Sequence, residues 1–129
     1  MNGSQFLGVC LGGAFGTGAR YLLSTGLLRL CGAGFPYGTF AVNLIGSFLV
    51  ALLTVVGIEG TALSPTMRLV LTTGVMGGFT TYSAFSLETL QFLQAGAHAA
   101  ALGYVAATLL GCLLMCWLGW QCGRWLVLT

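Results

Sequence analysis

Long apolar stretches separated by short polar segments dominate the hydropathy pattern of the chain. Only four arginines and two glutamates interrupt these stretches over 129 residues. A helix that spans a bilayer needs about 20 mostly apolar residues, and the pattern predicts four such spans, at about residues 5–28, 37–57, 66–95 and 98–121. Four spans use nearly the whole chain, so we expect an all-α membrane protein with one four-helix transmembrane domain over residues 1–129.

The third predicted span is too long to be one straight helix across the membrane. Residues 66–95 would measure about 45 Å as a continuous helix, against a hydrocarbon core of about 30 Å. Glycines meet hydroxyl side chains in its middle, from Gly74 to Ser86, and both residue types weaken helical hydrogen bonding. We therefore expect a third helix broken at mid-membrane, with unwound backbone and a cation site at Gly77 to Thr80.

Polar side chains recur with helical spacing in the second span. Thr39, Asn43 and Ser47 stand at i, i+4 and i+8 and so project from one helix face. Two interpretations are open for this stripe. Hydroxyl groups at this spacing can join neighbouring helices. The Asn43 carboxamide instead indicates contact with a ligand, because it offers two N–H donors and is costly to bury unpaired.

Two further pairs of residues share helix faces in the third and fourth spans. Tyr82 and Phe85 are three residues apart, and Tyr104 and Thr108 are four apart. The edges of aromatic rings are electropositive, so clustered edges can contact a small anion without burying a formal charge. Ordinary packing is the alternative for each ring taken singly. Taken with Asn43, the two pairs predict a lined path for a small anion.

The first span carries a ridge of small residues followed by a cation. Ser4, Gly8, Gly12 and Gly16 recur every four residues, which lets another helix approach closely. Arg20 lies in the same span, where a permanent charge is costly unless it meets polar surroundings. Arg20 either reaches the membrane interface with its long side chain or forms an electropositive vestibule that gathers an anion.

Composition argues against an enzyme. Apolar residues make up 57% of the chain, and the mean hydropathy is +0.98. Without lysine there is no P-loop or Schiff base, and one histidine with two separated acids provides no zinc-protease motif or carboxylate pair. Scattered arginines form no basic patch for nucleic acid. Cys112 and Cys116 share a helix face, but no further ligand converges there, so we interpret both as small apolar side chains.

Three stretches of the sequence carry a resemblance to a known family. They are Gly12 to Tyr21, Gly38 to Ser47 and Gly74 to Ser86. In this order and spacing the chain resembles the Fluc (CrcB) family of bacterial fluoride channels over nearly its whole length. The resemblance implies a multi-pass protein of the bacterial inner membrane that exports fluoride passively and so reduces its toxicity in the cytoplasm.

The resemblance also implies an assembly and a set of site residues. Two subunits inserted antiparallel would form a dual-topology homodimer with two fluoride pores. A structural Na⁺ at the dimer centre would be bound by backbone carbonyls of Gly77 and Thr80. Tyr82 stands where the family usually has Phe, and Thr108 where Ser is common. The residues implied for the fluoride path are Thr39, Asn43, Tyr82, Ser83, Phe85, Tyr104 and Thr108.

The distribution of arginines bears on how the chain inserts. Four spans place both termini on one side, which also carries Arg68 and Arg124, while Arg20 and Arg29 lie toward the other side. Two arginines against two give the positive-inside rule no preference. Such a balance is what insertion in both orientations requires.

Two other functions remain open from the sequence. A proton-coupled exporter similar to small multidrug transporters would need a titratable carboxylate at a central site, and Glu88 is the only candidate within the spans. A helix bundle that only scaffolds a larger complex would not need its polar stripes to converge. Fluoride flux measured without a proton gradient separates both from a channel.

Overall fold

The computed structural model describes residues 2–129, and every regular element in that range is helical. Three long helices have the length and hydropathy to cross a membrane, and a fourth span is interrupted. This confirms the expected all-α membrane fold. The elements are α1 (Gly3–Cys31), α2 (Tyr37–Ile58), α3 (Pro65–Leu69), the π-helical segment η1 (Val70–Met76), α4 (Gly77–Phe79), α5 (Tyr82–Gln94) and α6 (His98–Leu128).

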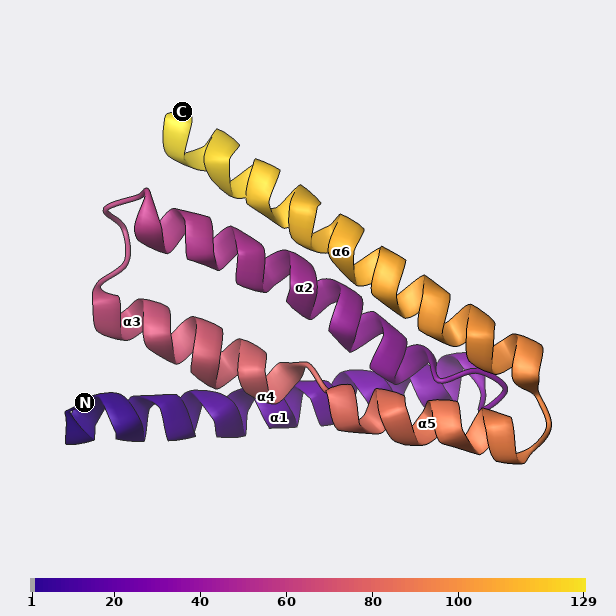
Figure 1. Cartoon of the computed structure of the whole chain (residues 1–129). Helices are drawn as coiled ribbons and strands as arrows, with labels where there is room; N and C mark the ends of the chain where they lie inside the picture. Colours follow the sequence, from indigo (N-terminus) through magenta and orange to yellow (C-terminus); the bar gives the residue numbers. More distant parts are fainter. Residues whose placement is uncertain (1) are drawn as a thin grey trace.

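Successive spans run in opposite directions, so both chain ends lie at the same end of the molecule. Figure 1 shows the two termini and the α2–α3 connection at one end, and the α1–α2 and α5–α6 connections at the other. Arg68 and Arg124 lie toward the first end, and Arg29 lies toward the second. α6 packs chiefly along α2, whereas α1 packs against η1, α4 and α2.

The last helix runs further than the hydropathy pattern predicts. We expected the span to end near residue 121, but α6 continues to Leu128. Its 31 residues amount to about 46 Å at 1.5 Å per residue, which exceeds a hydrocarbon core of about 30 Å. Hydropathy predicts the extent of the apolar span and not the end of the helix. The backbone stays helical past residue 121 because no proline interrupts residues 122–128.

The third span is broken within the predicted Gly74–Ser86 segment, and the unwound residues lie at the C-terminal edge of the predicted Gly77–Thr80 stretch. Gly77 and Gly78 are helical in α4, and the extended residues are Thr80 (φ −84°, ψ 157°) and Thr81 (φ −150°, ψ 119°). The hydroxyl of Thr81 accepts a hydrogen bond from the N–H of Ala84 at 3.2 Å and so caps the start of α5. A threonine cap, and not glycine flexibility, therefore sets the position of the break.

The small-residue ridge of α1 packs against the first half of the broken span, as predicted. Gly12 and Gly16 are buried. A Cβ atom added to Gly16 would lie 2.0 Å from the carbonyl oxygen of Val75, and one added to Gly8 would lie 2.8 Å from the side chain of Val70. The backbone of η1 can approach α1 this closely only because no side chains intervene.

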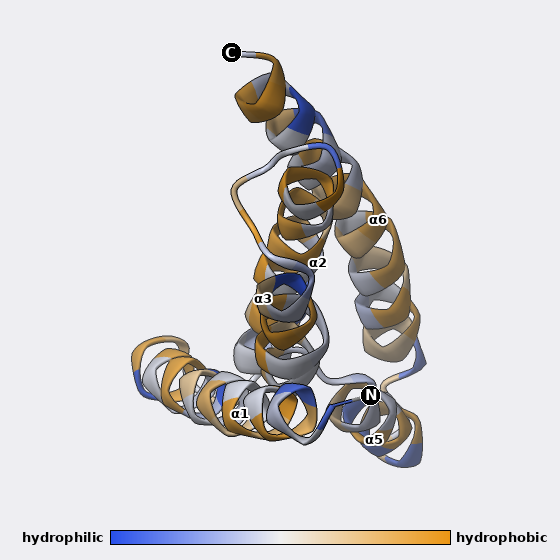
Figure 2. Ribbon diagram, turned by 90° about the vertical axis from the view of Figure 1, so that its left-hand side faces the viewer, coloured by the Kyte–Doolittle hydropathy of each residue, from blue (hydrophilic) through white to orange (hydrophobic). Residues whose placement is uncertain are grey.

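The surface of the described chain is largely apolar. Figure 2 shows hydrophobic and neutral residues along the helices, with the strongly hydrophilic ones concentrated near helix ends and connections. The buried apolar cluster is small and consists of Val42, Met76 and Phe79, with partly buried neighbours around it. Large apolar side chains such as Leu22 and Leu102 are more than two-thirds exposed. Such a surface suits lipid or another protein subunit, and not water.

Candidate functional site

Asn43 of α2 holds the extended backbone at the break. Its Nδ2 donates to the carbonyl of Thr81 at 3.0 Å, and its Oδ1 accepts from the N–H of Thr81 at 2.8 Å. The side chain is 9% exposed. The Asn43 amide therefore replaces helical partners that the break removes, and one N–H of its NH₂ group remains for another acceptor.

Because of the break, two backbone carbonyls lose the N–H donors that they would have in a continuous helix. In a continuous helix the N–H of Thr81 would donate to the carbonyl of Gly77, and the N–H of Ala84 to that of Thr80. Thr81 donates to Asn43 instead, and Ala84 donates to the hydroxyl of Thr81. Gly77 and Thr80, the two residues that we expected at a cation site, are thus the ones deprived of these donors.

Arg20 contacts the same break from α1. Its Nε donates to the carbonyl of Gly78 at 3.0 Å, and the hydroxyl of Thr17 lies 3.5 Å from that oxygen. The sequence offered two interpretations of Arg20, and neither included this bond to a carbonyl of α4. The guanidinium also borders a cavity of about 310 Å³, together with Thr17, Tyr21, Ser24, Thr39, Thr81 and Ala84.

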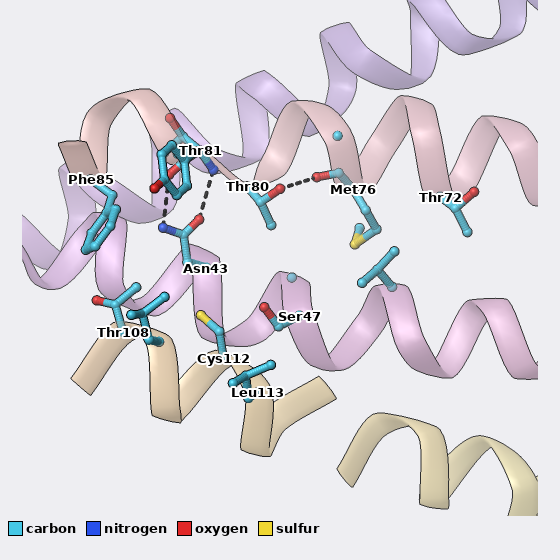
Figure 3. A pocket seen from close by; sticks show the side chains of 15 residues that line it. Asn43, Ser47, Thr72, Met76, Thr80, Thr81, Phe85, Thr108, Cys112 and Leu113 are labelled. Carbon is cyan, nitrogen blue, oxygen red and sulfur yellow. Dashed lines mark hydrogen bonds between the residues drawn. The ribbon is translucent and has the colours of Figure 1, made fainter. Parts of the chain in front are cut away.

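A second cavity, of about 390 Å³, lies between α2, the broken span and α6 (Figure 3). We call it the break cavity. Thr81 borders both cavities, so each of them adjoins the broken backbone. The structure gathers most of the predicted site residues here. Asn43, Ser47, Gly77, Thr80, Tyr82, Phe85 and Thr108 line the break cavity.

Aromatic rings form one wall of this region. Phe85 is 6% exposed and stacks on Tyr104, with ring centroids 5.1 Å apart and planes inclined by 24°. Tyr82 meets Phe85 in an edge-to-face arrangement at 5.6 Å, as their shared helix face predicted. The Tyr82 side chain is 77% exposed, so it lies on the surface that the single chain leaves open beside the break.

Thr108 lines the break cavity and carries a buried hydroxyl. It is 6% exposed, and its hydroxyl has no hydrogen-bond partner among the described residues 2–129. Buried hydroxyl groups are almost always paired with protein or with ordered water. Figure 3 places Thr108 below Phe85, so a buried hydroxyl without a partner among the described residues lies at the edge of the break cavity.

Glu88, which sequence reasoning assigned only to the exporter alternative, holds two of the predicted path residues through hydrogen bonds. One of its carboxylate oxygens accepts from the Thr39 hydroxyl at 2.7 Å, and the other accepts from the Tyr104 hydroxyl at 2.6 Å. Thr39 and Tyr104 were expected to line the path, and the structure shows both bonded to Glu88. Glu88 follows Phe85 by three residues on α5, so the sequence could have shown that the two side chains share one helix face.

Ser83 is not brought to the break cavity. It is exposed, it is absent from the lining residues, and its hydroxyl lies 3.2 Å from that of Thr81. Ser83 occupies the second position of α5, where its side chain turns to a different face of the helix from that of Phe85.

Comparison with known proteins agrees with this picture. A family described as "CrcB-like protein, Camphor Resistance (CrcB)" matches residues 7–120. A protein of Anaeromyxobacter dehalogenans named "Fluoride-specific ion channel FluC" is 50% identical over 123 residues, which cover 95% of this chain and 98% of the relative. Proteins of the same name from Sorangium cellulosum and Caulobacter vibrioides are 52% identical over 117 residues and 46% identical over 108 residues. These cover 91% and 83% of this chain, and 92% and 85% of the relatives. The match spans the helices that build both cavities, and the chain belongs to the CrcB-like protein family.

Proposed function

We propose that this protein is a fluoride-specific ion channel. Relatives about half identical over nearly their whole length carry that name. The chain is a multi-pass protein of the bacterial inner membrane, and it is a channel and not an enzyme. The observation in this structure that carries the proposal is the buried, unpaired hydroxyl of Thr108 beside Phe85 in the break cavity.

The chemistry of the lining suits a small anion that must shed water. The Thr108 hydroxyl and the remaining N–H of Asn43 can replace water as hydrogen-bond donors. The edges of Phe85 and Tyr82 offer weakly positive surface without a formal charge that would bind the ion too tightly to release it. Arg20, at the second cavity, raises the local concentration of anions before they reach the break. Fluoride then moves down its electrochemical gradient without a coupled proton.

One side of the break is not covered by any other part of the chain, and an antiparallel homodimer would cover it best. Tyr82 is 77% exposed, and nothing lies within 4 Å of a Cβ built on Gly77, although both residues border the break cavity. Lipid chains on this side would offer no hydrogen-bond donors or acceptors to polar backbone. A second copy would close it, and the balanced arginines permit that copy to insert in the opposite orientation.

A structural Na⁺ at the dimer centre fits the chemistry of the break. The carbonyls of Gly77 and Thr80 have lost their α-helical donors to the Asn43 and Thr81 side chains, and hard cations prefer oxygen ligands. The Thr80 hydroxyl already donates to the carbonyl of Met76 at 3.0 Å, so the proposed ligand from this residue is its backbone carbonyl. Na⁺ bound there would supply positive charge to which these carbonyl oxygens of two subunits could turn.

Nothing in the structure or the comparisons favours the proton-coupled exporter. Such a transporter needs a carboxylate that is free to exchange protons with a substrate site. Both oxygens of Glu88 accept hydrogen bonds from hydroxyl groups, and this residue is absent from the lining of either cavity.

Fluoride efflux from liposomes tests the proposed function. Purified protein is reconstituted in vesicles loaded with potassium fluoride, and a fluoride electrode records release after valinomycin is added, with equal pH on both sides. A channel releases fluoride rapidly under these conditions, and chloride-loaded vesicles serve as the control for selectivity. Absence of efflux from a monodisperse reconstituted protein would contradict the proposal, and efflux only under a proton gradient would favour the exporter.

A further inference from the structure

The outward face of α6 carries an exposed row of side chains that the proposed anion path does not use. We call it the α6 stripe and define it by five residues spaced four or three apart, which therefore share one helix face: Leu110, Leu114, Trp117, Gln121 and Arg124. All five are exposed, and none of them lines either cavity. The stripe is apolar as far as Trp117 and ends in an amide and a permanent cation.

The α6 stripe faces away from the rest of the chain. α6 packs on α2 through the buried Gly119, where an added Cβ would lie 2.1 Å from the carbonyl oxygen of Phe48. Gly119 is two residues from both Trp117 and Gln121, which places it on nearly the opposite side of the helix. The α6 residues that line the break cavity also lie outside the stripe. A second copy that covers the break therefore leaves the stripe to lipid.

Arg124 lies at the depth where the α2 span ends. It precedes Val127 by one helical turn, and a Cβ built on Gly60, just after α2, would lie 3.5 Å from the side chain of Val127. From Arg124 back to Leu110 the stripe measures about 21 Å at 1.5 Å per residue. Half of a hydrocarbon core is about 15 Å, so the stripe is long enough for the head group and one acyl chain of a lipid.

The guanidinium of Arg124 has no partner within residues 2–129. Arg20 and Arg68 each donate to a backbone carbonyl, whereas the side chains of Arg29 and Arg124 make no hydrogen bond in that range. α6 contains no Asp or Glu. A guanidinium binds a phosphate group through several N–H donors, and the Gln121 amide one turn earlier adds another. Arg29 differs, because α1 contains no tryptophan to lie at the membrane interface.

We propose that the α6 stripe binds one anionic phospholipid. The lipid phosphate lies at Arg124 and Gln121, and an acyl chain lies along Trp117 and the two leucines. Phosphatidylcholine also carries a phosphate, but its choline cation offsets that charge, so the stripe favours a lipid with net negative charge. This site is independent of fluoride conduction and goes beyond the proposed function.

Tryptophan fluorescence tests the site, because the chain has three tryptophans and all of them lie in α6. The protein is placed in nanodiscs that contain increasing fractions of brominated phosphatidylglycerol or brominated phosphatidylcholine, whose bromine atoms quench a tryptophan on contact. We expect a roughly fivefold preference for phosphatidylglycerol, which corresponds to about 1 kcal/mol. Arg124→Gln should abolish the preference, and Arg124→Lys should keep most of it. Arg29→Gln, the matched control, removes the same charge at the other end of the molecule and should leave the preference unchanged.

Three outcomes would overturn the proposal. They are an Arg124→Gln protein that keeps the wild-type preference, an equal loss of preference in Arg29→Gln, and weak quenching by both lipids, which would mean that a second copy of the chain covers the stripe.

If Arg124→Gln does not fold, the wild type is measured at two salt concentrations. The preference should fall between 0.1 M and 1 M NaCl, because the Debye length shrinks from about 10 Å to about 3 Å, and an unchanged preference would contradict the site. Fluoride efflux is recorded from the same preparations. Its absence would contradict the proposed function, while the lipid preference would still decide whether the site exists.

Discussion

Asn43 and Thr81 exchange two hydrogen bonds across the break, with the carboxamide of Asn43 acting as donor and acceptor to the backbone of one residue. The pair lets a helix stop inside the membrane without leaving both groups of Thr81 unsatisfied. It also divides the third span into two parts, because α4 ends before Thr81 and α5 begins after it. The anion path and the candidate cation site therefore depend on the same side chain.

Replacing Asn43 by Asp should remove fluoride efflux while the subunits still assemble. The carboxylate can accept from the N–H of Thr81, but when ionised it cannot donate to the carbonyl, and it places a negative charge beside the anion path. The lost buried hydrogen bond is expected to cost about 1–3 kcal/mol. Liposome efflux and size-exclusion chromatography check the two parts of this expectation.

Thr54→Val is the matched control for that variant. Thr54 lies on the same helix, and its hydroxyl donates only to the carbonyl of Val50 at 2.6 Å, within α2. We expect wild-type efflux from Thr54→Val. Normal efflux from a folded Asn43→Asp protein would exclude Asn43 from the path.

Adding one methyl group to Gly16 should destabilise the protein far more than adding one to Gly18. A Cβ on Gly16 would lie 2.0 Å from the carbonyl oxygen of Val75, whereas nothing lies within 4 Å of a Cβ on Gly18. Alanine otherwise favours a helix over glycine by about 1 kcal/mol. Gly18→Ala should therefore melt at or above the wild-type temperature in detergent, and Gly16→Ala well below it. Equal melting temperatures would contradict the close packing of α1 on η1.

The Tyr104 hydroxyl and the Glu88 carboxyl should stabilise the protein as a pair. Tyr104→Phe removes the donor to one oxygen of the partly buried Glu88 and is expected to destabilise the protein by about 0.5–1.5 kcal/mol, the net contribution of a typical hydrogen bond. In a Glu88→Ala background the same substitution should cost less, since the acceptor is already gone. Thermal unfolding of the two single variants and the double variant measures this coupling. Strict additivity would show that the bond does not stabilise the fold.

The two aromatic residues of the break cavity should respond differently to substitution. Tyr82→Phe removes a hydroxyl from an exposed side chain and keeps the ring against Phe85, so efflux should remain near the wild-type rate. Phe85→Ile removes a buried ring that stacks on Tyr104, together with the ring edge that we assign to the anion, so efflux should fall severely. Loss of efflux in Tyr82→Phe would instead assign a direct role to the phenol.

Dual topology predicts that the C-terminus is found on both sides of the membrane. A short tag after Thr129 should be reached by a membrane-impermeant reagent in about half of the molecules in intact cells, and in all of them after the membrane is opened. A matched protein with added arginines in the α2–α3 connection should shift to one orientation. A wild-type tag that is accessible from one side only would rule out the antiparallel dimer.

The sequence by itself determined the membrane class, the number of spans and the interruption of the third span. These follow from local quantities: the length of apolar runs against the bilayer thickness, and the density of glycine and hydroxyl residues between Gly74 and Ser86. The helical spacing of Tyr82 and Phe85 also placed them correctly beside one another. The family and its residue pattern were recognisable from the same stretches.

Only the tertiary structure decided which polar groups pair with which. Local propensity spread the predicted break over the glycines and hydroxyl residues from Gly74 to Ser86. Within that segment Gly78 packs in a helix against α1 and Thr81 is the cap, because Asn43 is available 38 residues earlier in the chain to hold its backbone. The bonds of Arg20 to Gly78 and of Tyr104 to Glu88 join residues 58 and 16 positions apart. Such pairings depend on how helices approach one another, and hydropathy and periodicity describe each helix only by itself.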